Sequence, residues 1–363
     1  MKKNKNYVDL KDQPVPEGQH LLEVDDLKMY FHTEDGVVRA VDGVSYTLDR
    51  GETLGVVGES GSGKSVTAMT IMGLISMPPG KIEGGDVRYR GRSILEMTEE
   101  EMQHIRGNDI AMIFQDPMTS LNPVYKIGKQ VGEGLRLHRG YSKQEALKRA
   151  TELLDLVGIP EPEKRVNEYP HQFSGGMRQR VMIAMALACD PDILIADEPT
   201  TALDVTIQAQ IIELMQEMQE KNGNAIIMIT HDLGVVADMA DKIMVMYAGR
   251  PVEFGTADEI FYESRHPYTW GLIRSIPEQA IDEKKPLTPI HGNPPSLMNL
   301  PEGCVFSPRC PYATDKCRKQ RPERVVTESG HYSACHYSGD PEFLKNAPET
   351  SRTCKDSRKG GEA

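Results

Sequence analysis

The stretch Gly58-Glu59-Ser60-Gly61-Ser62-Gly63-Lys64-Ser65 organises the rest of this chain. It consists of a glycine, four residues and then Gly-Lys-Ser, which is the pattern of a loop that holds phosphate groups. Its three glycines allow backbone N–H groups to approach phosphate oxygens closely, because no Cβ stands between them. Lys64 can reach the terminal phosphates of a nucleotide, and the Ser65 hydroxyl can bind Mg²⁺.

The residues on either side of this loop predict the strand and the helix that a phosphate loop requires. Residues 53–57 are short and apolar and predict a buried strand, whereas residues 66–74 predict a helix. The N-terminus of that helix favours a bound anion, because its N–H groups are free. We therefore predict that a nucleotide is bound by Gly58, Ser60, Gly61, Ser62, Gly63, Lys64, Ser65 and Val66.

Length, charge and apolar content exclude several classes of protein. The chain has 363 residues, which is enough for two domains with a sizeable core. Its net charge of −12 at pH 7 argues against a protein that coats nucleic acid. No apolar run follows the first residues as in a signal peptide, and none reaches the ~18 residues of a membrane span. We expect a soluble protein that reaches a membrane only through partners.

A small antiparallel β layer is predicted ahead of the phosphate loop. Short β-type segments alternate here with turn signals, and they lie at residues 21–24, 37–41 and 44–48. Phe31 falls within this layer. Its ring either packs in the core or stacks on a nucleotide base, and the sequence leaves both possibilities open.

The pattern becomes helical between residues 118 and 190. Residues 142–157 have apolar side chains at helical spacing, and residues 160–169 have the composition of a loop. A further helix follows Ser174-Gly175-Gly176, and this opening exposes N–H groups to an anion. One exposed helix end contributes only about 0.3–1 kcal/mol to such binding. The element can therefore contact a phosphate but cannot hold a nucleotide alone.

Two adjacent carboxylates follow the apolar residues 193–196, which predict a buried strand. Asp197 and Glu198 lie at the end of this strand, where buried charge is costly unless a ligand uses it. Beside a phosphate loop, Asp197 can bind the Mg²⁺ shell and Glu198 can orient a water molecule. Residues 225–230 predict another strand, and it ends at His231. This alternation of strands and helices predicts an α/β fold with ligands at the carboxyl edge of the sheet.

The order of these motifs resembles the ATP-binding-cassette (ABC) ATPases over residues 20–255. The motifs are, in chain order, GESGSGKS, IFQDP, FSGGMRQR, ILIADEPT, TALD and ITHD. The longer runs YPHQFSGGMRQR and ADEPTTALDVTIQAQI, with RHPYTWGL further on, resemble the OppD and DppD type of subunit in the peptide importers. The resemblance implies a P-loop NTPase fold with a RecA-like core, an antiparallel β subdomain and a helical subdomain. It also implies ATP and Mg²⁺ as the nucleotide and its metal.

The resemblance further implies a role for each motif residue of the nucleotide site. Phe31 would stack on adenine, and Gln115 would lie near Mg²⁺ and the attacking water. Asp197 would hold the metal shell and Glu198 would be the general base. His231 would touch the γ-phosphate.

Other motif residues would act between two subunits. Ser174 and Gly176 would contact the γ-phosphate bound by a partner subunit, and Asp204 would carry the contact between the subunits. Met177 stands where the family usually has Gln, so no polar side chain is available there. The implied partners are a second ATPase subunit (a paralogue in this subfamily), two transmembrane permease subunits and an extracytoplasmic peptide-binding protein, with no nucleic acid. The protein would then be a peripheral subunit at the cytoplasmic face of the membrane.

Two alternatives stay open at this point. An importer of nickel or of another substrate shares the cassette motifs. A soluble ABC ATPase that acts on nucleic acid or ribosomes usually has coiled-coil insertions, two cassettes or basic arms, and the sequence has none of these. Exporters often fuse a membrane span to the cassette, which this sequence does not do.

Four cysteines mark a change of composition beyond residue 255. Cys304, Cys310, Cys317 and Cys335 are separated by five, six and seventeen residues in a proline-rich region. Stable disulfides are not expected in a cytosolic chain, and structural zinc sites favour pairs two to four residues apart. The spacing therefore favours a [4Fe–4S] cluster, as does the resemblance, with zinc and free thiols as the alternatives.

These observations predict four parts of the chain. Residues 1–19 would be a flexible N-terminus, residues 20–255 the nucleotide-binding domain, and residues 256–345 a small C-terminal domain with the cysteine cluster. Residues 346–363 are polar and would form a disordered tail.

Overall fold

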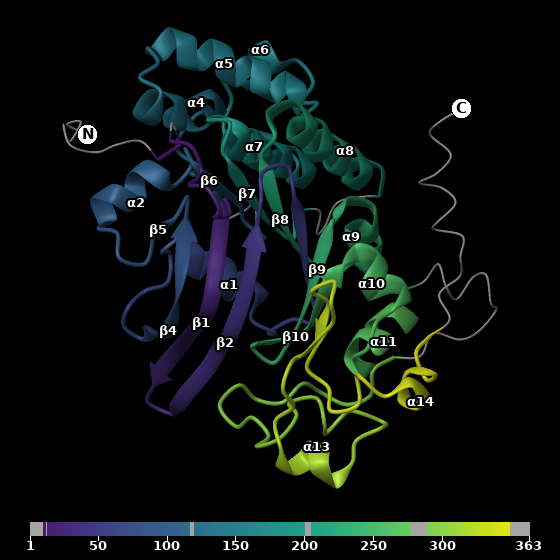
Figure 1. The fold of residues 1–363 in the computed structure, drawn as a ribbon. Helices are drawn as coiled ribbons and strands as arrows, with labels where there is room; N and C mark the ends of the chain where they lie inside the picture. The colour runs from purple at the N-terminus through teal and green to yellow at the C-terminus, as the bar shows by residue number, and fades with distance from the viewer. Residues whose placement is uncertain (1–9, 12, 117–119, 200–204, 277–288, 349–363) are drawn as a thin grey trace. The chain divides into compact units, whose positions relative to one another are not determined.

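The computed structural model describes residues 10–11, 13–116, 120–199, 205–276 and 289–348 (Figure 1). Contacts divide the chain into two compact units, each made of separate parts of the sequence. Unit 1 contains Met1–Met29, Gly43–Leu54 and Ser65–Thr230, and unit 2 contains Tyr30–Asp42, Gly55–Lys64 and His231–Ala363. The phosphate loop up to Lys64 thus belongs to unit 2, and Ser65 and the helical region belong to unit 1.

The β layer contains β1 and β2, which lie ahead of the phosphate loop as predicted, and two strands that follow the loop and were not predicted, in the order β2-β1-β4-β5. Their bounds are β1 Leu22–Thr33, β2 Gly36–Leu48, β4 Gly80–Tyr89 and β5 Arg92–Ser93. The expectation of separate segments at 37–41 and 44–48 was wrong, because β2 continues through Gly43. That glycine has a φ of 86°, a conformation that it adopts without a steric cost.

Three parallel strands form the buried centre of unit 1, with β7 between β6 and β8 (Figure 1). They are β6 Ile110–Ile113, β7 Ile193–Asp197 and β8 Ala225–Thr230, and all their residues are buried. Parallel strands are covered on both faces, which explains why they appear in the sequence as continuous apolar runs. The predicted strand at 225–230 is confirmed, and the carboxyl ends of all three strands lie at one edge.

Helices of unit 1 pack together in one group, as α4 contacts α5 and α7, and α5 contacts α6 and α7 (Figure 1). They are α4 Ile127–His138, α5 Lys143–Leu156, α6 Pro162–Arg165 and α7 Gly175–Leu187. The predicted helix at 142–157 is confirmed, and Ser142 caps it together with Glu145. The predicted loop at 160–169 instead contains the single turn α6, because Pro162 is tolerated in a first helical turn.

The other helices of this part are α1 Lys64–Ile71, α2 Glu99–Ile105 and α8 Val205–Asn222, with a 3₁₀ turn at Pro170–Gln172. Strand β3, Thr53–Val57, leads into the phosphate loop, and α1 begins at the loop's lysine. The predicted strand, loop and helix are therefore present in that order. Within the described residues, no helix combines the length and the apolar character that crossing a membrane requires.

Unit 2 is built on the antiparallel pair β9 Lys242–Tyr247 and β10 Arg250–Thr256. The short strands β12 Tyr332–Ser333 and β11 Val325–Val326 extend this pair in the order β11-β12-β10-β9. The helices are α9 Leu233–Met239, α10 Ala257–Tyr262, α11 Pro267–Arg274, α13 Asp315–Lys319 and α14 Pro341–Leu344. The proline- and cysteine-rich region thus belongs to the same unit as β9 and β10, and the boundary predicted near residue 255 stays a prediction.

Candidate nucleotide site and cysteine pocket

Two positions of the phosphate loop accept only glycine. Gly58 and Gly63 have φ values of 150° and 101°. A Cβ on Gly58 would lie 2.2 Å from the carbonyl oxygen of Met246, and a Cβ on Gly63 would lie 2.3 Å from that of Ala40. No other side chain fits either position without a backbone shift. The glycines that the motif requires are therefore also required by the packing of unit 2.

Polar groups of the loop fit a bound phosphate chain. The Lys64 ammonium is buried and donates to the carbonyl oxygens of Gly58 and Glu59, at 2.7 and 3.0 Å. The Gly249 N–H donates to the Ser62 carbonyl at 2.9 Å and holds the loop. The Ser62 hydroxyl is buried and has no hydrogen-bond partner among the described residues. Because a buried polar atom normally has a partner, this hydroxyl and the lysine suit an anion added at the loop.

Ser65 and Asp197 lie together in unit 1. The Ser65 Oγ donates to the Asp197 Oδ1 at 3.0 Å, although 132 residues separate them. Asp197 ends strand β7, and its side chain is buried. Hydroxyl and carboxylate oxygens are ligands that Mg²⁺ prefers. The pair fits the magnesium ion that accompanies a nucleotide.

Glu198 and Gln115 form a second pair at the same sheet edge. The Gln115 Nε2 donates to the Glu198 Oε2 at 2.9 Å. Glu198 has a φ of 48°, and its N–H donates to the Ile229 carbonyl of the neighbouring strand at 2.8 Å. A left-handed backbone is costly for a non-glycine residue, and such strain clusters at functional sites. This arrangement holds a carboxylate beside an amide, which suits the binding and deprotonation of a water molecule.

The Ser-Gly-Gly element opens helix α7 as predicted. The Ser174 Oγ accepts a hydrogen bond from the Met177 N–H at 3.3 Å and caps the helix. Ser174 and Gly175 are exposed and Gly176 is half-buried. Further along the helix, the Gln179 Nε2 donates to the carbonyl of Pro199, which follows the two carboxylates, at 2.6 Å. The helix start is therefore accessible to a ligand held by another molecule.

Of the remaining predicted residues of the nucleotide site, Phe31 and His231 lie in unit 2, Val66 lies in unit 1 and one is outside the described residues. Phe31 belongs to β1 and is half-buried, so it is not a core residue. His231 follows β8 directly and is exposed. Val66 is the third residue of α1. Asp204 lies outside the described residues.

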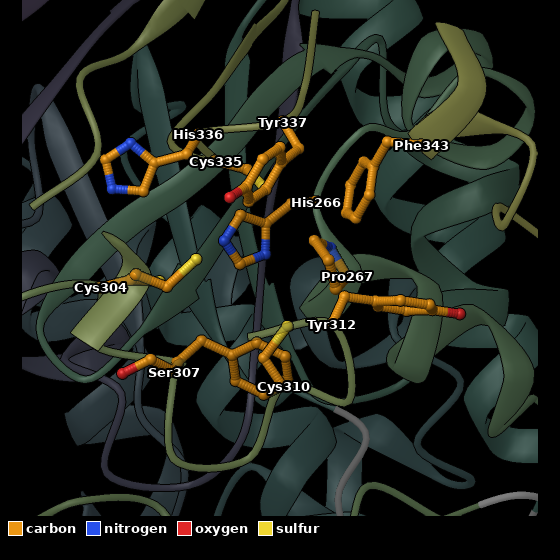
Figure 2. Close-up of a pocket in the computed structure, with 12 residues that line it drawn as sticks. His266, Pro267, Cys304, Ser307, Cys310, Tyr312, Cys335, His336, Tyr337 and Phe343 are labelled. Carbon is orange, nitrogen blue, oxygen red and sulfur yellow. The ribbon is translucent and has the colours of Figure 1, made fainter. Parts of the chain in front are cut away.

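All four clustered cysteines line one pocket, although up to 31 positions separate them in the sequence (335 − 304). Figure 2 shows the sulfur atoms of Cys304 and Cys310 directed toward the His266 ring. Burial raises the pKa of Cys310 to about 11 and that of Cys335 to about 12, so both thiols are neutral near pH 7. Burial also lowers the pKa of His266 to about 3, which keeps its ring uncharged. Deprotonation of these two thiols therefore requires a nearby cation, because its charge offsets the free-energy cost of burying a thiolate.

A single metal ion does not match this arrangement. Across the described residues, no three His, Cys, Asp or Glu side chains are placed to hold one metal ion. A mononuclear site needs its sulfurs about 2.3 Å from the ion, whereas an iron–sulfur cluster binds its cysteines through separate irons. The structure therefore shows four thiols around one pocket and, within the residues that it describes, no formed metal site, so the cluster stays a prediction.

Sequence reasoning missed one residue that contacts the phosphate loop. Arg309 lies between Cys304 and Cys310, and its guanidinium donates to both carboxylate oxygens of Glu59. Glu59 is one of the four unspecified positions of the phosphate-loop motif, and no motif pairs it with Arg309. A charged residue beside a cysteine pattern is the only sequence signal at position 309.

Comparisons with known proteins give relatives along most of the chain. Residues 41–201 match the family model for ABC transporters, and residues 252–317 match that for the oligopeptide/dipeptide transporter C-terminal region. The chain is 58% identical to the oligopeptide transport ATP-binding protein OppD of Bacillus subtilis, across 86% of this chain and 87% of that protein. It is 52% identical to the dipeptide transport ATP-binding protein DppD of Escherichia coli, across 88% and 97% respectively.

Solved structures with a similar fold include the ATP-binding cassette MJ0796 in a dimeric post-hydrolysis state bound to ADP and Pi. Its TM-score is 0.60 at 29% identity, and the match covers 65% of this chain and 98% of that one. A second similar structure is cbiO1 from Clostridium perfringens, part of an ABC transporter complex, with a TM-score of 0.56 at 29% identity, covering 67% of this chain and 91% of that one.

Proposed function

Because the chain belongs to the family of ABC oligopeptide and dipeptide transport ATP-binding proteins, we propose that it is the ATP-hydrolysing subunit of a peptide importer. The observation that carries this proposal is the pairing of Ser65 with Asp197 and of Gln115 with Glu198 at one sheet edge. These are the side chains that phosphoryl transfer to water needs, namely metal ligands, a base and a group that orients the water.

In this proposal each residue of the site has a separate role in ATP hydrolysis. The loop backbone and Lys64 hold the phosphates, and Ser65 and Asp197 would hold Mg²⁺, which would offset the negative charge of the phosphates. Gln115 orients a water molecule, and Glu198 accepts its proton as the water oxygen bonds to the γ-phosphorus. The bond from that phosphorus to the bridging oxygen breaks, and ADP leaves with the electron pair.

Three further roles support binding rather than the reaction itself. Phe31 stacks on the adenine ring, for which its half-buried position leaves one part of the ring accessible. His231, exposed after β8, contacts the γ-phosphate. The exposed start of α7 supplies Ser174 and Gly176 to the ATP of a partner subunit, and Asp204 contacts that subunit.

The proposed assembly contains a second ATPase subunit, two transmembrane permease subunits and an extracytoplasmic peptide-binding protein. Each ATP lies between the phosphate loop of one chain and the Ser-Gly-Gly element of the other, so ATP closes the pair and hydrolysis separates it. A relative of known structure is dimeric. The protein is then peripheral at the cytoplasmic face of the membrane.

Peptide should stimulate the ATPase activity of the complete complex. We expect ATP hydrolysis in proteoliposomes to rise when a peptide and the binding protein are added together, because the loaded binding protein favours the closed state. The measurement is phosphate release with peptide, with Ni²⁺ and with neither. Stimulation by Ni²⁺ instead of peptide would favour the nickel-importer alternative. Stimulation by nucleic acid without the permease would favour the soluble class.

We also propose that Cys304, Cys310, Cys317 and Cys335 hold a [4Fe–4S] cluster in a small C-terminal domain. The four thiols line one pocket, and burial raises the pKa of Cys310 and Cys335, so a cation bound there would favour their thiolate forms. The proposed role of the cluster is structural or regulatory, since the region is proline-rich and has few regular elements to stabilise it.

Protein prepared anaerobically should be brown and contain iron and acid-labile sulfide in equal amounts. Cys310→Ser should lose most of both, because one cluster ligand is removed. Cys189→Ser is the matched control, since Cys189 is a buried cysteine of unit 1 outside this pocket. The measurements are iron and sulfide analysis with visible absorbance. Stoichiometric zinc without sulfide, or metal-free protein, would contradict the proposal.

A further inference from the structure

A buried arginine of the cysteine-rich region contacts the phosphate loop. The side chain of Arg309 is 4% exposed, and its Nη1 and Nη2 donate to the Glu59 Oε2 and Oε1 at 2.5 and 3.0 Å. Glu59 is the second residue of the loop motif, directly after Gly58. Two parallel bonds from a guanidinium to a carboxylate fix direction as well as distance.

The rest of the guanidinium is also satisfied, which makes this contact rigid. Nη1 additionally donates to the Tyr247 hydroxyl at 3.3 Å, Nη2 to the Ile290 carbonyl at 3.1 Å and Nε to the His291 carbonyl at 2.9 Å. An arginine has five N–H donors, and these contacts are five in number. A side chain held in this way cannot leave Glu59 without losing several bonds at once.

The other side of Glu59 is held as well. Its backbone N–H donates to the Tyr268 hydroxyl at 2.8 Å. Tyr268 packs against Tyr247 and Phe306, with ring centroids 4.6 and 5.3 Å apart respectively. Carboxylate and backbone of this loop residue are therefore both bound by groups outside the loop.

The position of Arg309 is set by the turn that carries Cys304 and Cys310. The Arg309 N–H and the Cys310 N–H both donate to the Phe306 carbonyl at 3.0 Å. The Cys304 N–H donates to the Cys317 carbonyl at 2.8 Å, which closes the turn onto the next cysteine. The same short turn thus lines the cysteine pocket and reaches the phosphate loop.

We propose that Arg309 is a positioning residue of the nucleotide site, which orients the phosphate loop through Glu59 and cancels the negative charge of that carboxylate. The inference rests on the proposed function, because it requires that the loop binds ATP. A carboxylate next to the phosphates repels them, and the guanidinium removes this repulsion. The C-terminal region would therefore contribute to ATP affinity without touching ATP.

Arg309→Met tests this proposal, because methionine keeps much of the length and loses the charge and all donors. We expect the full chain to bind MgATP about tenfold more weakly, the scale of one charge-assisted hydrogen bond. In the complete complex, KM for ATP should rise by a similar factor while kcat changes little. Arg318→Met is the matched control, since Arg318 pairs with Asp315 at 3.1 Å in the same region and both are exposed.

A second substitution separates charge from packing. Glu59→Gln in the Arg309→Met background removes the unpaired carboxylate and should restore MgATP affinity to within about threefold of the unchanged protein. If Arg309 only stabilised the fold, the double variant would bind no better than Arg309→Met. Should Arg309→Met not fold, Arg309→Lys serves instead, with a smaller loss that Glu59→Gln again reverses.

The outcomes distinguish this inference from the proposed function. If Arg309→Met left the MgATP affinity and the KM for ATP unchanged, or if Glu59→Gln did not restore the affinity, only the proposed role of Arg309 would be overturned. Lys64→Ala is measured beside them by calorimetric titration with MgATP. If Lys64→Ala also left MgATP binding unchanged, the loop itself would not bind ATP, and the proposed function would fail with the inference.

Discussion

Replacing Glu198 by glutamine is expected to lower ATP turnover by about 10²–10⁴-fold, the usual contribution of a general base. Glutamine keeps the size of the side chain and can still contact Gln115, which lies 2.9 Å away in the unchanged protein. It cannot accept the proton of the attacking water. The phosphate loop is not altered, so MgATP affinity should stay the same. When the variant is mixed with its partner subunit, the two should accumulate as a closed dimer that ATP stabilises.

The measurement is phosphate release in the complex with the partner's own site disabled, because a second competent site would otherwise mask the loss. Glu213→Gln is the control, since Glu213 is an exposed carboxylate on helix α8. Hydrolysis by the Glu198→Gln site at a rate close to normal would contradict the assignment of Glu198 as the general base. So would a parallel loss of MgATP binding, since the residue is proposed to act on water and not on the nucleotide.

Replacing Lys64 by alanine is expected to weaken MgATP binding about 10²-fold. The buried ammonium donates to two loop carbonyls at 2.7 and 3.0 Å, and it is the one cation that the motif itself supplies to the phosphates. One hydrogen bond to a charged group contributes about 1.5–3 kcal/mol, and the upper end of that range corresponds to about 10²-fold in affinity.

Binding is measured by calorimetric titration of MgATP into the full chain. Lys221→Ala is the control, because Lys221 is an exposed cation at the end of α8. Affinity that stays within about twofold of the unchanged protein would contradict the role of the loop. The two variants also separate two steps, since Glu198→Gln should bind and not hydrolyse, whereas Lys64→Ala should do neither well.

The local elements were the most predictable part of this molecule. Strands at 53–57 and 225–230 and the helix at 142–157 occur where predicted, because a continuous apolar run or a helical period is a property of neighbouring residues. The α/β fold followed from the alternation of such elements. The error at residues 37–48 was to expect two short segments, 37–41 and 44–48, whereas β2 is one strand that passes through Gly43 with a positive φ.

The candidate site was partly predictable for a different reason. Parallel strands bring their carboxyl ends to one edge, so the residues that follow β6 and β7 lie close together although they are distant in the sequence. The contact of Gln115 with Glu198 is of this kind. Glu198 was named from its place after an apolar strand and Gln115 from the resemblance, and the structure shows that the two side chains are in contact.

The sequence alone determined that this protein has a phosphate loop, where that loop lies and which residues can serve a nucleotide there, because those requirements are local sterics and short-range chemistry. Only the tertiary structure decided that Arg309 reaches Glu59, across 250 residues. Neither residue belongs to a pattern that demands the other. Their contact exists because the rings of Tyr247, Tyr268 and Phe306 pack together and place the cysteine-bearing turn against the loop. Packing of this kind depends on the shape of many side chains at once, and no local rule encodes it.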